Sequence, residues 1–303
     1  MAVLNSVIEL QIIIFLIILL GVILTRMHII VPAGRKCLTD LLIDLILPCN
    51  IICSFMIEMN AEIIKASVTV LLIALGIQIV CYLLGKVIYW FVPKSQKMVL
   101  QYATMCSNAG FMGNPVIEGI YGAQGLLYAS IYLIPLRFFM WSAGLFCFTK
   151  TDMKTALKKL ALHPCIIAVW IGFLLMLTQY QPPAAVTRTL KYLSGCTLPV
   201  SMLVIGSILA GVRIKSMISK KVLYFAGVRL LLIPLITLLV CRLLELDGLV
   251  TGVCVILAGM PAGSTTAILA EKYDGDAEYA SKLVFVTTLL SLLTIPVLFA
   301  LTV

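Results

Sequence analysis

Residues 107–116 read Ser-Asn-Ala-Gly-Phe-Met-Gly-Asn-Pro-Val and lie in the middle of the apolar run 98–120. Pro115 has no backbone N–H and clashes with a preceding carbonyl, whereas Gly110 and Gly113 tolerate unwound backbone. Asn108 and Asn114 add amide side chains. At 1.5 Å per helical residue, Asn108 lies roughly 15 Å into the run, near the midplane of a ~30 Å hydrocarbon core. The stretch predicts a membrane helix that is interrupted near 110–115.

A second stretch has the same character. Residues 258–266 read Ala-Gly-Met-Pro-Ala-Gly-Ser-Thr-Thr, with Pro261 between Gly259 and Gly263 and with hydroxyl side chains following at Ser264, Thr265 and Thr266. Two helices broken at the midplane are expected to cross, so this interruption is predicted near 259–264, in contact with the first. The N–H groups of the half-helices that follow the breaks favour an anion, and the free carbonyls favour a cation. The alternative is a pair of proline kinks that neighbouring helices repair.

The composition supports a membrane setting for both stretches. Of 303 residues, 62% are hydrophobic and 12% are charged, whereas soluble domains are close to half apolar and a quarter charged. This excludes a soluble enzyme, a nucleic-acid-binding module and a disordered regulator. The net charge of +9 is expected to reflect basic loops beside anionic lipid. The ten cysteines lie mostly within apolar runs, so neither a disulfide framework nor a metal site is predicted.

Charged and Pro/Gly-rich loops divide the chain into ten apolar runs. We expect transmembrane helices near 7–25, 38–57, 66–92, 98–120, 123–149, 163–180, 189–211, 222–243, 248–272 and 279–302. With the N-terminus outside, the inside loops, which include 150–162, hold 15 Lys and Arg residues and the outside loops hold 4. Since basic loops remain in the cytoplasm, both termini are predicted to be extracytoplasmic, in a multi-pass protein of the cell (inner) membrane.

The two halves of the chain repeat. Leu47-Pro48 recurs as Leu198-Pro199, and the tripeptide Tyr-Ala-Ser at 128–130 recurs at 279–281, both at an offset of 151 residues. Five helices are an odd number, so the second half enters the membrane upside down. We therefore predict an all-α membrane protein with two inverted five-helix repeats, 1–149 and 163–303, which is an architecture of secondary transporters.

The motif Asn108-x-Gly110-x-x-Gly113-x-Pro115 resembles the fourth-helix motif of the auxin efflux carrier family. The later stretches Gly-Met-Pro at 259–261 and Thr-Ile-Pro-Val at 294–297 support the resemblance, which covers the whole chain without the long central loop of the plant members. It is therefore similar to a compact prokaryotic member. Two departures stand out: Thr265 occupies a position that is often Asn in the family, and Asn114 one that is often apolar.

The resemblance implies both an architecture and an activity. It implies a scaffold of spans 1, 2, 6 and 7, a transport domain of spans 3–5 and 8–10, a homodimer formed through the scaffold, and transport of small organic anions such as mono- or dicarboxylates. The substrate-side residues expected at the crossing are Asn108, Gly110, Gly113, Asn114, Pro115, Arg137, Pro261, Gly263, Ser264 and Thr265. The residues expected to face them from the scaffold are Pro48, Asn50, Pro199 and Ser201.

Several charged and hydroxyl side chains lie within the predicted spans. Arg137, about halfway along its span, is expected to point toward the crossing, either to bind a substrate carboxylate or as a structural tie to a carboxylate or to the carbonyls of the broken helices. Asp44 is expected to reach the inner interface, and Arg229 to snorkel toward it. Thr266, Thr287 and Ser291 are candidate ion ligands, although hydroxyls also bond helices to one another.

No catalytic or ATP-binding motif is present in the sequence, so an enzyme is not predicted. No cofactor is expected, and coupling to H⁺ or Na⁺ stays open. Two alternatives also remain: a cation/proton antiporter of related fold, for which spans 4, 5, 9 and 10 offer no acid pair at depth, and a membrane sensor that does not transport.

Overall fold

The computed structural model describes residues 2–56, 60–140, 147, 162, 164–211, 218–263, 265–272 and 275–302. Within these ranges the regular structure is helical, and the one extended pairing is an isolated bridge between two residues. The expected loop 150–162, the end of the predicted span 123–149, and Ser264 fall outside the description, apart from residues 147 and 162.

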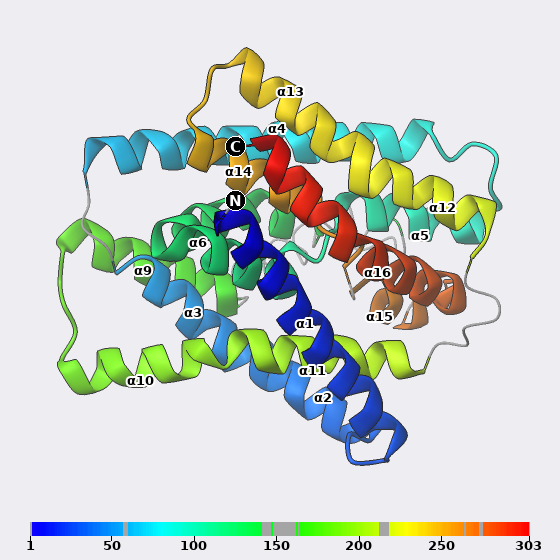
Figure 1. The fold of residues 1–303 in the computed structure, drawn as a ribbon, viewed down its shortest axis with the longest axis horizontal. Coiled ribbons are helices and arrows are strands. Elements are labelled where there is room, and N and C mark those ends of the chain that lie inside the picture. The colour runs from blue at the N-terminus through cyan, green and yellow to red at the C-terminus, as the bar shows by residue number, and fades with distance from the viewer. Residues whose placement is uncertain are drawn as a thin grey trace.

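The first half of the chain folds into long helices that are interrupted at several points (Figure 1). Its elements are α1 (Ala2–Arg26), α2 (Pro32–Leu41), the π-helical segment η1 (Leu42–Ile46), α3 (Leu47–Ser54), α4 (Ala61–Val87), α5 (Lys94–Met105), the π-helical segment η2 (Ala109–Gly113) and α6 (Asn114–Phe139).

The second half has the same character. Its elements are α9 (Pro164–Thr178), α10 (Ala184–Gly195), α11 (Thr197–Ala210), α12 (Lys220–Gly227), the π-helical segment η5 (Val228–Leu232), α13 (Ile233–Leu243), α14 (Gly248–Ala258), α15 (Thr265–Lys272) and α16 (Ala277–Thr302).

Four helical segments in the described residues are long and apolar enough to cross a bilayer, namely 61–87, 184–208, 220–243 and 277–302. Shorter apolar helices lie at 12–26, 164–178 and 248–258. An apolar surface made of so many leucine, isoleucine and valine side chains is expected where lipid replaces water as the solvent. The fold is therefore that of an all-helical membrane protein, as the composition indicates.

Local sequence explains where two of these helices begin and bend. The Asn60 side chain accepts a hydrogen bond from the backbone N–H of Ile63 at 2.8 Å, so α4 begins five residues before the predicted span at 66. Gly122 has φ 65° and ψ −155° inside α6. Only glycine adopts such angles readily, and the resulting kink lies at the expected boundary between the runs 98–120 and 123–149.

A close backbone-to-backbone contact joins α1 to α11 through two glycines, Gly21 and Gly206. A Cβ atom on Gly206 would collide with the carbonyl of Ile18 and lie 2.9 Å from the Cα of Gly21. Small residues let two membrane helices approach backbone to backbone, and dispersion contacts then hold them together. The same two helices lie one across the other in Figure 1.

Candidate functional site at the crossing of two broken helices

The helix that begins with α5 is interrupted immediately after Met105. Cys106 has extended backbone angles (φ −109°, ψ 93°), and Ser107 forms an antiparallel bridge with Ala262 of the second interrupted helix. The N–H of Asn108 donates to the carbonyl of Pro261 at 2.7 Å, and the N–H of Gly263 donates to the carbonyl of Cys106 at 2.9 Å. Unwound backbone at membrane depth needs such internal partners. Each interrupted stretch therefore supplies hydrogen-bond partners for the backbone of the other.

The predicted contact between the two stretches is thus present, but the first break lies nearer the N-terminus than expected. The prediction placed it near 110–115, whereas the helix is open at 106–108 and 109–113 is already π-helical. Pro115 lies in the first turn of α6, which continues the helix from η2 without a break. The second half-helix therefore begins before Pro115, and this proline does not mark the interruption. The second break, after α14, agrees with the predicted range 259–264.

Arg229 of η5 holds the carbonyl ends of both broken helices. Its side chain is 3% exposed. Nε donates to Met260 at 2.9 Å, Nη1 to Thr104 at 3.0 Å and Nη2 to Ala258 at 2.9 Å, in each case to the backbone carbonyl. The expectation that Arg229 snorkels toward the interface is therefore wrong. The guanidinium is the cation that the free carbonyls favour, because its planar fork can serve several acceptors at once.

The half-helices that follow the breaks begin at the same crossing. The carbonyl of Asn108 accepts from the N–H groups of Met112 and Gly113, at 3.0 and 3.2 Å, and that of Gly263 accepts from Thr266 at 2.9 Å. The first N–H groups of a helix have no partner within it. Two helix N-termini therefore lie beside the bridge, so the crossing favours negative charge.

The glycines of the crossing have different surroundings. A Cβ on Gly113 would lie 2.6 Å from a Leu257 methyl group, and one on Gly263 would lie 3.0 Å from the carbonyl oxygen of Cys106. These two glycines are needed for close packing. A Cβ on Gly110 would meet no atom within 4 Å, so Gly110 borders open space at the start of the second half-helix.

Buried polar atoms without a hydrogen-bond partner occur on both interrupted stretches. They are Oγ of Ser107, Nδ2 of Asn108, both side-chain polar atoms of Asn114, and Oγ1 of Thr266. The four side chains are at most 7% exposed. Because buried polar groups are nearly always paired, such a cluster indicates a place where a polar ligand or water binds.

The candidate ion ligands have different partners. The Thr287 hydroxyl accepts from the N–H of Ala262 at 3.1 Å and donates to the carbonyl of Leu283 at 2.6 Å, so it supports the bridge. Ser291 donates to the carbonyl of Thr288 within its own helix. Thr265, which was expected on the substrate side and not as an ion ligand, accepts a hydrogen bond from the hydroxyl of Tyr102 at 3.1 Å.

Of the expected scaffold residues, Asn50 makes the most informative contacts. It is fully buried, and its Nδ2 donates to Glu118 Oε2 of α6 at 3.3 Å and to Ser194 Oγ of α10 at 2.9 Å. Pro48 is half-buried in the first turn of α3. Ser201 is buried and bonds within α11, whereas Pro199 is exposed.

Glu118 is a further polar residue of this region that is not among the predicted site residues. It is an acidic residue within an apolar run, and it follows Asn114 by four residues, which places both side chains on one helix face. An intramembrane carboxylate at this spacing was a sufficient signal to select it.

Arg137 is buried, as expected, with 5% exposure and an Nη1 atom without a partner. Arg137 and Asp44 both lie within electrostatic range of the Cys165 thiol, which in turn contacts the Ile43 carbonyl of η1. The carbonyls of the broken helices are held by Arg229 instead. The tie to the carbonyls of the broken helices, one alternative for Arg137, is thus made by Arg229, whereas the tie of Arg137 to a carboxylate stays a prediction.

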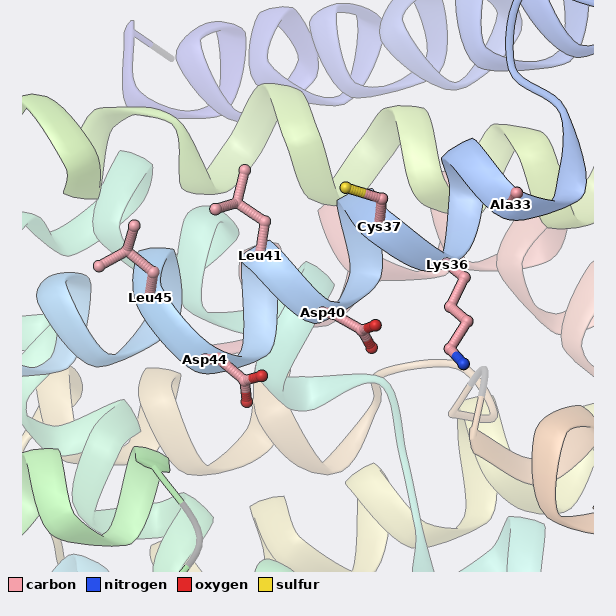
Figure 2. A pocket seen from close by; sticks show the side chains of 7 residues that line it. All are labelled: Ala33, Lys36, Cys37, Asp40, Leu41, Asp44 and Leu45. Atoms are coloured by element: carbon pink, nitrogen blue, oxygen red, sulfur yellow. The ribbon is translucent and has the colours of Figure 1, made fainter.

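A separate hollow lies along α2 and η1. Figure 2 shows Lys36, Asp40 and Asp44 projecting from one side of this helix and Cys37, Leu41 and Leu45 from another. Asp44 is exposed, and its interfacial position stays a prediction. The lining residues all come from α2 and η1, so this hollow is distinct from the crossing.

Known membrane transport proteins resemble this chain over most of its length. Residues 6–299 match the family described as membrane transport protein. An uncharacterized transporter of Methanocaldococcus jannaschii is 26% identical over 95% of this chain and 96% of its own length. Another, from Methanothermobacter thermautotrophicus, is 30% identical over 65% of each chain. A proposed malonate transporter of Rhizobium meliloti is 27% identical over 46% of this chain and 43% of its own length.

The family match covers nearly the whole chain, and the broken, crossing helices carry the motif on which the sequence resemblance rests. The chain therefore belongs to the membrane transport protein family, the family of the auxin efflux carriers.

Proposed function

We propose that the protein is a secondary carrier for small organic anions, mono- or dicarboxylates, which bind at the crossing of the two broken helices. The observation that carries the proposal is the cluster of unpartnered buried polar atoms on Ser107, Asn108, Asn114 and Thr266. This cluster lies beside two helix N-termini, whose N–H groups and dipoles favour a carboxylate. The likeness to a proposed malonate transporter supports the same class of substrate.

Alternating access follows from the proposed architecture. In it, ten spans form two inverted repeats, 1–149 and 163–303, and the transport domain moves against the scaffold around the crossing. The Asn50–Glu118 contact supports this division, because it joins a span assigned to the scaffold to one assigned to the transport domain. A homodimer formed through the scaffold and extracytoplasmic termini belong to the same proposal.

A thermal-shift screen tests the proposed substrate class. The purified protein is heated with mono- and dicarboxylates, malonate among them, with and without Na⁺. We expect carboxylates to raise the melting temperature, because a ligand that binds only the folded state stabilises it. Uptake of a stabilising anion into proteoliposomes then tests transport. If no carboxylate shifts the melting temperature or enters the vesicles, the proposed substrate class is wrong.

Asn108→Ala tests the contribution of the crossing itself. The amide Nδ2 of Asn108 has no protein partner, so the loss of this donor breaks no hydrogen bond among the described residues. We expect the melting temperature without ligand to stay close to that of the wild type, while the affinity for a stabilising anion falls about tenfold, which corresponds to one lost hydrogen bond to a charged group. Unchanged affinity would contradict a role for Asn108 in the site.

Arg137→Lys separates two roles for the buried arginine. Lysine keeps the charge but loses the planar fork that holds a carboxylate with two hydrogen bonds. We expect the anion affinity to fall by about tenfold or more while the melting temperature changes little, since Nη1 has no protein partner. If the melting temperature falls and the affinity is retained, Arg137 is a structural residue. Both quantities are measured on the same purified variant.

A further inference from the structure

The contact between Asn50 and Glu118 places a carboxylate where the two proposed domains meet. Glu118 lies on the half-helix that begins at the crossing, one helical turn from the unpartnered amide of Asn114. Its Oε2 accepts from the fully buried Asn50, which also donates to Ser194 of α10. Three helices, α3, α6 and α10, are therefore joined through one amide group and one carboxylate.

Glu118 forms no ion pair with any of the described residues. Lys191 of α10 and Glu118 both lie within electrostatic range of the Cys53 thiol of α3. The only ion pair in the described part of the chain joins Lys282 to Glu278. The other helices packed against α6, namely α1, α4, α9 and α14, bring no described side chain into hydrogen-bonding contact with Glu118. Glu118 is also exposed. A charged side chain facing lipid is costly, so this exposure indicates contact with water.

An amide partner suits a carboxyl group that changes its protonation state. The ionised form accepts from Asn50 Nδ2, as observed. The protonated form can donate its O–H to Asn50 Oδ1 after the amide rotates, because this buried oxygen has no partner. Ser194 can accept or donate in either arrangement. The contact across the domains therefore persists in both states, whereas an ion pair would be lost on protonation.

The charge of Glu118 opposes the binding of an anion next to it. A substrate carboxylate near Asn114 is repelled by the ionised side chain, and protonation of Glu118 removes this repulsion. Binding of a proton and binding of an anion must then favour each other by the same factor, since linkage is reciprocal.

We infer that Glu118 is the proton-binding residue that couples anion transport to H⁺, with Asn50 as its partner on the scaffold. The inference rests on the proposed anion function and adds the coupling ion to it. One proton from the aqueous side binds the Glu118 carboxylate as one substrate anion enters the crossing, so proton and anion move together. The positive charge that the carbonyl ends require is supplied by Arg229, so these carbonyls do not need Na⁺.

Calorimetry with malonate tests the inference on the purified wild-type protein. Titrations in buffers of different ionisation enthalpy give the number of protons taken up with each anion. For the wild type we expect close to one proton per anion at pH values where Glu118 is ionised, and an affinity that falls about tenfold per pH unit in that range. Glu118→Gln is expected to take up no proton and to bind malonate with little dependence on pH.

The matched control is Glu62→Gln, an exposed acid in the first turn of α4, which should behave like the wild type. In proteoliposomes, Glu118→Gln should retain exchange of malonate for malonate but lose accumulation driven by a pH gradient. If Glu118→Gln does not fold, the same measurements are made on Glu118→Ser.

The possible failures are distinguishable. Malonate binding with an equal proton count in the wild type and Glu118→Gln would overturn the inference and leave the anion carrier standing. Absence of binding by every carboxylate tested would overturn the proposed substrate class, and the inference with it.

Discussion

Arg229→Ala is expected to lower the stability of the folded protein by about 3 kcal/mol or more, because each buried carbonyl left without a donor costs about 1–3 kcal/mol. The three carbonyls that lose their partner belong to Thr104, Ala258 and Met260, at the ends of the two first half-helices. The stability of Arg229→Lys should lie between those of the wild type and Arg229→Ala, since one ammonium group cannot replace three directed N–H groups. Thermal melts of the purified variants measure the difference.

The control for this prediction is Arg242→Ala. Arg242 makes a single hydrogen bond to the Leu301 carbonyl from an exposed position, where water can replace it, so its loss should leave the melting temperature almost unchanged. Methylguanidinium added to Arg229→Ala should restore part of the lost stability by occupying the same three carbonyls. Equal melting temperatures for Arg229→Ala and Arg242→Ala would show that the crossing does not depend on this cation.

Gly206→Ala is expected to separate α1 from α11 and to destabilise the fold by more than about 2 kcal/mol. The new Cβ would collide with the backbone carbonyl of Ile18 and press on the Cα of Gly21. Backbone cannot move aside as a flexible side chain can, so the cost is at the upper end of the range for overpacking, about 1–3 kcal/mol. Alanine also favours helix over glycine by about 1 kcal/mol, so a net loss must come from the contact.

Gly76→Ala is the matched control for this second prediction. Gly76 lies within α4, is exposed, and has no atom within 4 Å of the position of a Cβ. The same substitution should therefore leave the melting temperature unchanged or raise it slightly. A Gly206→Ala protein as stable as Gly76→Ala would show that the close approach of the two helices is not required.

The position of the interruption was predicted more accurately for the second stretch than for the first. In the second stretch, Gly259, Pro261 and Gly263 all lie within the unwound segment, because α14 has ended and no new helix has begun. In the first stretch, Pro115 suggests the position of the break, but this residue lies within the half-helix that follows the break. Whether a proline ends one helix or lies within the next depends on where the preceding helix ends. Here the pairing of Ser107 with Ala262 sets that end.

The sequence by itself determined the class of this protein and the two stretches where its helices are interrupted. An apolar composition and two Gly/Pro stretches with polar residues at midplane depth are local properties of the chain, and they suffice to predict membrane helices with two interruptions. The resemblance to the auxin efflux carriers rested on the same residues, and the family match confirms it.

Only the tertiary structure decided which polar side chains serve which partner. Arg137 and Arg229 are both arginines within predicted spans, and nothing in their sequence surroundings shows that Arg229 meets three carbonyls from two other helices. The hydrogen-bond partner of Glu118 is likewise Asn50, 68 residues away in the sequence. Hydrophobic patterning fixes the depth of a residue along its own helix, but the rotation and pairing of helices depend on packing between them. The partner of a buried charge is therefore known only when the helices are assembled.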